Sequence, residues 1–73
     1  MKSSFFVCIS NDEYPAALEL RKIYEVIPDE ISLQKGLLRV IDESGEAYLY
    51  PGTMFEPIQV PDNLACTLHR LAS

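Results

Sequence analysis

His69 is the only histidine in the 73-residue sequence, and histidine is the residue type best suited to general acid–base catalysis near neutral pH. A catalytic histidine needs a nucleophile or a second acid–base group held beside it, but His69 lies near the end of the chain with Arg70 next to it. The three glycines stand at separate turns, and no glycine-rich phosphate loop, nucleophile elbow or dinucleotide fingerprint is present. We therefore expect a solvated histidine at a helix end, no catalytic residue, no cofactor and no enzymatic activity.

An acidic turn is the second place where side chains could do chemistry. Asp42, Glu43 and Glu46 gather carboxylate oxygens, which are ligands for divalent cations, but their spacing lacks the ordered ligand set of a calcium-binding loop. Two distant cysteines and one histidine are too few for a zinc site. We expect a solvated acidic turn that contributes to solubility, and no metal site.

Aromatic residues form the best candidate site, because an aromatic patch rimmed by carboxylates suits a cationic or proline-containing peptide. The residues of this candidate peptide-binding site are Tyr24, Tyr48, Tyr50, Pro51 and Phe55, with Asp42 and Glu43 at its rim. The alternative is that two or three of the rings complete a small core and leave their hydroxyl groups at its edge. Of the two interpretations we favour the second.

Charge and hydropathy argue against several classes of partner. The net charge is −5, and six scattered basic residues hardly provide the cluster that nucleic acid phosphates require. The longest apolar run, Phe5 to Ile9, is far shorter than the roughly 20 residues that span a bilayer, and the first residues lack the pattern of a secretory signal. We expect a cytoplasmic protein that binds neither nucleic acid nor membrane. Cys8 and Cys66 are expected to be small buried hydrophobic residues, and a disulfide between them stays open.

The clearest structural signals lie between Gly36 and Ile58. Residues 37–41 form an aliphatic, β-branched run, the next four residues favour a turn, and residues 46–50 alternate as a returning strand would. One face of this hairpin is expected to be aliphatic and the other to carry tyrosines. Pro51 breaks the ladder, and Pro57 makes the following short strand an edge. Residues 5–9 predict a further, central strand.

The segment 16–27 fits two secondary structures. Helical spacing is shown by Leu20, Ile23, Tyr24 and Ile27, which follow a proline suited to a first helical turn. An alternating inner face is shown by Leu18, Leu20, Tyr24 and Val26, with Glu19, Arg21 and Glu25 outside. We favour the strand and keep the helix as the alternative.

Two short helices complete the prediction. Asp29 is suited to cap a helical turn that Gly36 ends in left-handed geometry, and Ile31 and Leu33 are expected to cover one end of a barrel. A second helix is predicted over residues 62–71, because three leucines recur at spacings of four and three. Its apolar face, which could cover a barrel mouth or join two copies of the chain, consists of Leu64, Leu68 and Leu71.

The order of these elements resembles that of an SH3-like barrel. The stretches IYEVIPDE, GLLRVIDESGEAYLYP and MFEPI resemble small uncharacterised bacterial proteins, over roughly residues 14–60, with DESGE-AYLYP as the most specific part. The resemblance implies a mainly β fold: one domain over residues 1–73, with a five-stranded, partly open barrel at about 4–60 and a C-terminal helix at about 62–71. It implies no activity, and the absence of tryptophan and of an ALYDY-type motif separates the chain from proline-binding SH3 domains.

Two functions remain after these exclusions. The first is a small protein- or peptide-binding module that uses the tyrosine-rich face. The alternative is a structural subunit without a ligand, which forms a homo-oligomer through the Leu64, Leu68 and Leu71 face of the C-terminal helix.

Overall fold

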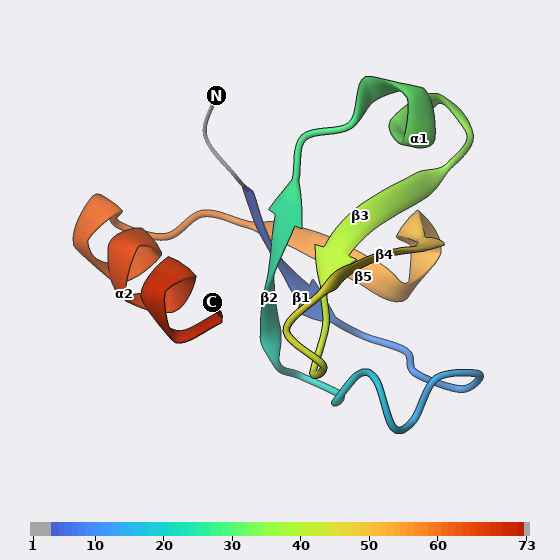
Figure 1. Cartoon of the computed structure of the whole chain (residues 1–73), viewed down its shortest axis with the longest axis horizontal. Helices are drawn as coiled ribbons and strands as arrows, with labels where there is room; N and C mark the ends of the chain where they lie inside the picture. The colour runs from blue at the N-terminus through green and yellow to red at the C-terminus, as the bar shows by residue number, and fades with distance from the viewer. Residues whose placement is uncertain (1–3, 73) are drawn as a thin grey trace.

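The computed structural model describes residues 4–72, and its centre is one antiparallel β-sheet (Figure 1). The elements in chain order are β1 (Ser4–Cys8), β2 (Ile23–Ile27), α1 (Glu30–Gln34), β3 (Leu37–Ile41), β4 (Ala47–Pro51), the 3₁₀ turn η1 (Gly52–Met54), β5 (Phe55–Ile58) and α2 (Asp62–Ala72). The strands follow the spatial order β4-β3-β2-β1-β5. The mainly β fold, the predicted strands at 5–9, 37–41 and 46–50, and the C-terminal helix are therefore confirmed.

The expected closure into a partly open barrel is wrong. Within residues 4–72 the five strands form a single sheet, and β4 and β5 are its two edges. The two edge strands are joined by the three-residue turn η1 but are not paired with each other, because β5 pairs with β1, where Phe55 lies opposite Cys8. Pro57 lies in β5, at a sheet edge as predicted.

Residues 23–27 form a strand, so the helical alternative for this segment is wrong, but the strand is shorter than predicted. Residues 14–22 form turns, in which the Tyr14 carbonyl accepts hydrogen bonds from the N–H groups of Ala17 and Leu18. Arg21 then adopts a left-handed conformation with φ +66°, which breaks the alternation of sides along the chain. Because residues 18–20 are not in a strand, Leu18 and Leu20 do not share a face: Leu18 is fully buried, whereas Leu20, expected on the same inner face, is 53% exposed.

Cross-strand pairs bring the core residues to one face of the sheet, which we call the core face. Val40 pairs with Val26 on one side and with Tyr48 on the other, so these side chains share a face. Tyr50 likewise pairs with Leu38, which corrects the expected separation of tyrosines from aliphatic residues. The buried cluster on this face consists of Cys8, Leu18, Tyr24, Val26, Leu38, Val40, Tyr50, Met54 and Phe55.

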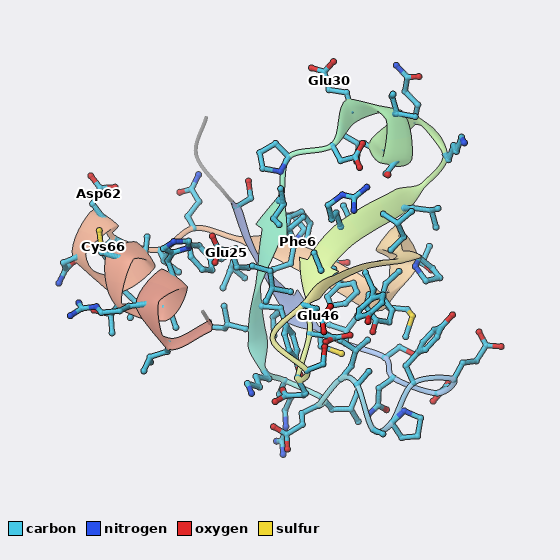
Figure 2. The ribbon with its side chains drawn as sticks, viewed as in Figure 1. Phe6, Glu25, Glu30, Glu46, Asp62 and Cys66 are labelled. Carbon is cyan, nitrogen blue, oxygen red and sulfur yellow. The ribbon has the colours of Figure 1, made fainter. Side chains whose placement is uncertain are left out.

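The opposite, back face of the sheet carries α2, which lies beside β2 (Figure 1). His69 reaches from α2 to Glu25 in the middle of β2, and its Nδ1 atom lies 2.8 Å from both carboxylate oxygens. Figure 2 shows Glu25 between the strand and the helix. No helix within the described residues is long and apolar enough to cross a membrane.

The short helix α1 begins as predicted at Asp29. Its carboxylate accepts hydrogen bonds from the Ser32 N–H at 3.1 Å and the Ser32 hydroxyl at 2.8 Å, and it forms an ion pair with Arg39 at 2.7 Å. Gly36 follows with φ +75°, also as predicted. The expectation that Ile31 and Leu33 cover one end of the sheet is wrong, because these contacts turn Ser32 inward and leave both apolar side chains exposed.

Candidate functional site

Three of the predicted aromatic site residues lie in the core. Tyr24, Tyr50 and Phe55 are each almost fully buried, and the Phe55 ring packs edge-on against both tyrosines with ring centroids 6.3 Å apart. Because β2, β4 and β5 place all three on the core face, they cannot form an exposed tyrosine face. The prediction of that face is wrong for these residues, and the alternative, that the rings complete the core, is confirmed.

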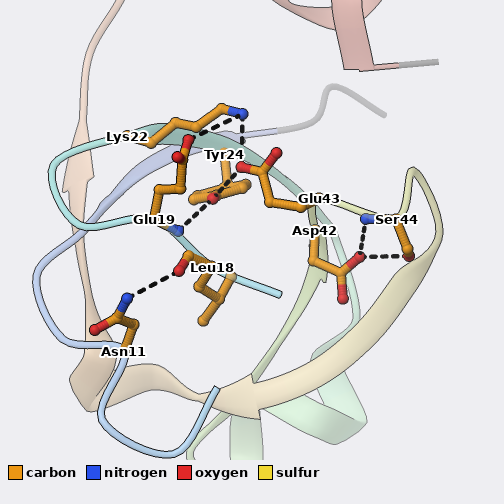
Figure 3. Close-up of polar contacts among 8 residues, drawn as sticks. All are labelled: Asn11, Leu18, Glu19, Lys22, Tyr24, Asp42, Glu43 and Ser44. Carbon is orange, nitrogen blue, oxygen red and sulfur yellow. Dashed lines mark hydrogen bonds and ion pairs between the residues drawn. The ribbon is translucent and has the colours of Figure 1, made fainter. Parts of the chain in front are cut away.

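The buried tyrosine hydroxyls meet the acidic turn. The Tyr50 hydroxyl donates to Asp42 Oδ2 at 2.5 Å, and the Tyr24 hydroxyl donates to Glu43. Glu43 also lies 2.6 Å from the ammonium group of Lys22, and the Ser44 N–H donates to Asp42 at 2.8 Å (Figure 3). The two carboxylates are therefore occupied by different partners.

The environment fixes the protonation of this network. Burial raises the pKa of Tyr50, and its bond to Asp42 raises it further, so the hydroxyl stays a donor. Burial alone would raise the pKa of Asp42, but hydrogen bonds from Ser44 and Tyr50 outweigh burial and hold it below its ordinary value. The hydrogen bond from Lys22, followed by that from Tyr24, lowers the pKa of Glu43. In this structural network the tyrosine hydroxyls therefore keep their protons and donate, and the carboxylates of Asp42 and Glu43 accept.

Hydrogen bonds to the Asp29 carboxylate make the stability of the fold sensitive to acid. The hydrogen bond from the Ser32 N–H, then those from Arg39 and the Ser32 hydroxyl, lower the pKa of Asp29 from 3.8 to about 2. The folded state then binds fewer protons than the unfolded chain, so this stabilisation is complete above about pH 4 and is lost as the pH falls towards 2.

We expect the free energy of unfolding, measured by urea titration, to fall between pH 4 and pH 2 in the wild type, and to fall less steeply in Asp29→Asn. Glu30→Asn, which changes an exposed acid on the same helix, is the matched control and should keep the wild-type slope. Equal slopes in wild type and Asp29→Asn would contradict the assignment to Asp29.

Exposed aromatic surface remains at Tyr48, which is 51% exposed, and at Tyr14, whose ring packs edge-on against Tyr50 with centroids 4.9 Å apart. Tyr14 was not among the predicted site residues. The only local signal was the Tyr-Pro dipeptide, which indicates a turn and says nothing about which strand the turn contacts. Beside Tyr48, Leu49 is 43% exposed.

The hydrogen-bond ladder between β3 and β4 shows which backbone groups of β4 are used. The N–H of Gly52 donates to the Gly36 carbonyl at 2.8 Å, and the N–H of Asp42 donates to the Glu46 carbonyl at 3.1 Å. Bonded and non-bonded pairs alternate along an antiparallel ladder. Even-numbered residues of β4 therefore direct their backbone groups to β3, and odd-numbered residues direct theirs away from it.

The outer edge of β4 consequently presents the N–H and C=O groups of Ala47 and Leu49. β4 is the last strand on this side of the sheet within residues 4–72. Its sequence up to Tyr50 contains neither proline nor charge, whereas the other edge, β5, contains Glu56 and Pro57. Charges and prolines are the features that protect edge strands from pairing, so β4 is the less protected edge.

The predicted self-association face on α2 is divided by the fold. Leu68, which is half-buried, and Leu71, which is largely exposed, line a groove with Ile23 and Ile41 of the sheet, whereas Leu64 is exposed and does not line it. His69, expected to be solvated, is bound by Glu25, which was expected outside and is buried.

The two cysteines lie in different environments, and both are free. Cys8 is buried as predicted, but Cys66 is exposed on the side of α2 away from the sheet (Figure 2). The expected burial of Cys66 is wrong because only part of α2 packs on β2. No group of three or more metal-ligating side chains occurs within residues 4–72.

Together these features define a small, mainly β protein with an exposed edge strand flanked by a tyrosine and a leucine. Comparisons of the chain with protein-family models, with curated proteins and with solved structures find no match. Its function therefore has to be inferred from its own residues.

Proposed function

We propose that this protein is a binding module that holds an extended segment of a partner protein by strand addition at the outer edge of β4. The observation that carries the proposal is the outward direction of the Ala47 and Leu49 backbone groups in an edge strand without protecting charges. An added strand supplies the missing hydrogen bonds, and side chains that flank the edge supply specificity. Tyr48 and Leu49 are the exposed side chains placed to do so.

The proposal retains the predicted protein or peptide partner but changes the site. Of the predicted residues, Tyr48, Tyr50 and Pro51 lie on β4, but Tyr50 is buried, and Asp42 and Glu43 belong to the structural network described above. Self-association through α2 has weaker support, because Leu68 already packs on the sheet of its own chain. Catalysis is not proposed, because the core tyrosine hydroxyls are buried and held by carboxylates.

An SH3-like class remains part of the proposal. It is supported by five short strands, a helical turn after the second of them, a tight hairpin, and a break at Pro51 and Gly52 before the last strand. The net charge of −5 supports a partner other than nucleic acid. A cytoplasmic location is likewise part of the proposal.

The test uses proline to remove one outward backbone donor. Leu49→Pro deletes an N–H that points away from β3, so the fold keeps its ladder while an added strand loses a hydrogen bond and meets the proline ring. Leu49→Ala is the matched control, because it keeps the N–H and removes most of the side chain. Both variants are first checked for a wild-type urea midpoint.

We expect affinity capture with the tagged wild type to retain partner proteins that Leu49→Pro loses. The lost hydrogen bond alone should weaken binding by about 0.5–1.5 kcal/mol. The proline ring also excludes the added strand sterically, so we expect the affinity to fall tenfold or more in total. Leu49→Ala should bind more weakly than wild type but more tightly than Leu49→Pro. Capture of the same proteins by all three forms would overturn strand addition at β4.

A further inference from the structure

The two sides of the β4 edge differ in chemistry, and this difference specifies the partner strand. We infer that the segment bound at β4 alternates cationic and apolar side chains, with the cationic ones beside Tyr48 and the apolar ones beside Leu49. The inference rests on the proposed function and adds the class of partner. A strand presents successive side chains to opposite faces of the sheet. The side chains of an added strand would therefore contact Tyr48 on one face and Leu49 on the other.

The core-face side of the edge is aromatic and acidic. Tyr48 is half-exposed there, and the exposed Glu46, the residue before β4, stands two positions earlier in the same alternation, opposite Asp42. Tyr14 adds a second partly exposed ring through its contact with Tyr50, and the same loop carries two exposed acids, Asp12 and Glu13. Aromatic faces and carboxylates both attract ammonium and guanidinium groups.

This chain already contains one such arrangement inside itself. The ammonium group of Lys22 lies 5.5 Å from the centroid of the Tyr24 ring and 2.6 Å from a Glu43 oxygen. Tyr48 and Glu46 offer the same two groups at the edge of the sheet. The sequence from residue 40 to residue 69 contains no lysine or arginine, so β4 itself supplies no cation, and the nearest ones, Arg39 of β3 and Lys22, are already bound to Asp29 and Glu43.

The back-face side of the edge is apolar. Its three residues are Ala47, Leu49 and Pro51, and Leu49 keeps 43% of its surface exposed. On the neighbouring strand, Ala47 pairs with Ile41, and Leu49 pairs with Arg39, whose guanidinium group is bound to Asp29. An apolar side chain of the partner would bury Leu49 at this position, whereas a charged one would lose water without gaining a partner.

A second copy of this chain is less suited to the site. An antiparallel β4–β4 pair would bring Tyr48 and Glu46 of one copy against the same residue types of the other, with no cation between them. Each copy also carries a net charge of −5. The charge pattern therefore favours a basic segment of another protein.

The experiment uses three short synthetic peptides that alternate valine with lysine, with glutamate or with serine. Each is titrated into the ¹⁵N-labelled wild-type protein, and amide chemical shifts report where it binds. We expect the valine–lysine peptide to shift the amides of Ala47 and Leu49, to bind at least tenfold more tightly than the valine–serine peptide, and to weaken as salt is added. The valine–glutamate peptide should not bind.

Two variants connect this preference to named residues. Tyr48→Leu keeps an apolar side chain without the ring, and Glu46→Gln removes one charge; each should weaken the valine–lysine peptide severalfold and leave the valine–serine peptide unchanged. Glu30→Gln, an exposed acid on α1, is the control and should bind as wild type does. Equal binding of all three peptides at Ala47 and Leu49 would overturn the cationic preference while leaving strand addition standing. Absence of any shift at β4 would overturn both.

Discussion

Replacing Leu18 with alanine is expected to remove about 2–5 kcal/mol from the free energy of unfolding, because a fully buried leucine loses its contacts and leaves a cavity. Small domains have roughly 5–15 kcal/mol in total, so this single change should bring the protein close to unfolding. Leu18 packs in the core cluster although it lies in a segment without regular secondary structure. It is the fully buried side chain of residues 9–22, and it anchors this segment to the sheet together with Tyr14 and Ala17.

Two hydrogen bonds hold Leu18 and its neighbour in place. The Asn11 side-chain amide donates to the Leu18 carbonyl at 2.9 Å (Figure 3). The Glu43 N–H donates to the Ala17 carbonyl at 3.0 Å. The surrounding backbone is therefore fixed to two other parts of the chain. A cavity at Leu18 cannot close easily, which places the expected loss in the upper part of the range.

Leu20→Ala is the matched control for Leu18→Ala, since it makes the same chemical change two residues away at a side chain that is 53% exposed. Substitutions at exposed positions usually change stability by about 0.5 kcal/mol or less. Urea titration of both variants gives the comparison. Similar losses in the two variants would show that the segment does not anchor through Leu18.

The second large effect concerns the contact between His69 of α2 and Glu25 of β2. The Glu25 side chain is 2% exposed, whereas that of His69 is 65% exposed, so the carboxylate depends on the histidine for its hydrogen bonds more than the reverse. His69→Ala leaves a buried carboxylate without this partner. We expect a loss of about 1–3 kcal/mol, the cost of an unsatisfied buried polar group.

Glu25→Leu, unlike His69→Ala, should leave the free energy of unfolding unchanged or raise it. Leucine suits the apolar surroundings, which include Phe5 as the cross-strand partner of Glu25, and replacing buried ion pairs with apolar residues is often neutral or stabilising. In the Glu25→Leu background, His69→Ala should then cost little. The double-mutant cycle is therefore expected to be strongly non-additive.

Urea titration of the four forms measures the cycle, and amide shifts of α2 show whether the helix stays on the sheet. Lys22 and Glu43 also line the groove beside this pair, and their charges could add to the measured coupling energy. If the contact between Glu25 and His69 dominates, added salt should change the coupling energy only modestly, because salt screens buried groups weakly. Additive single and double variants would show that the 2.8 Å contact contributes nothing to stability.

The candidate site was only partly open to prediction. The sequence identified β4 as a strand that ends at Pro51, and it included Tyr48 among the aromatic residues of the candidate site. It could not separate Tyr48 from Tyr50, because two tyrosines on the same face of one strand carry the same local signal. Their difference arises from what covers each ring, and Tyr14 from a distant loop lies against Tyr50.

What the sequence by itself determined are the features that depend on residues close together in the chain. Asp29 caps α1 through Ser32, three residues later, and Gly36 and Gly45 adopt the positive φ values that their turns require. The hairpin and α2 follow from periods of two and of three to four residues, which are likewise local.

The tertiary structure alone decided which surfaces are covered, because burial depends on segments that are distant in sequence. The pairing of β5 with β1 rather than with β4 left β4 without an outer partner within residues 4–72, and so made its edge available. The placement of α2 on the back face put Glu25 in the interior and gave His69 a partner 44 residues away. No local pattern encodes either outcome, because a strand residue shows the same alternation whether its face meets water, a loop or a helix.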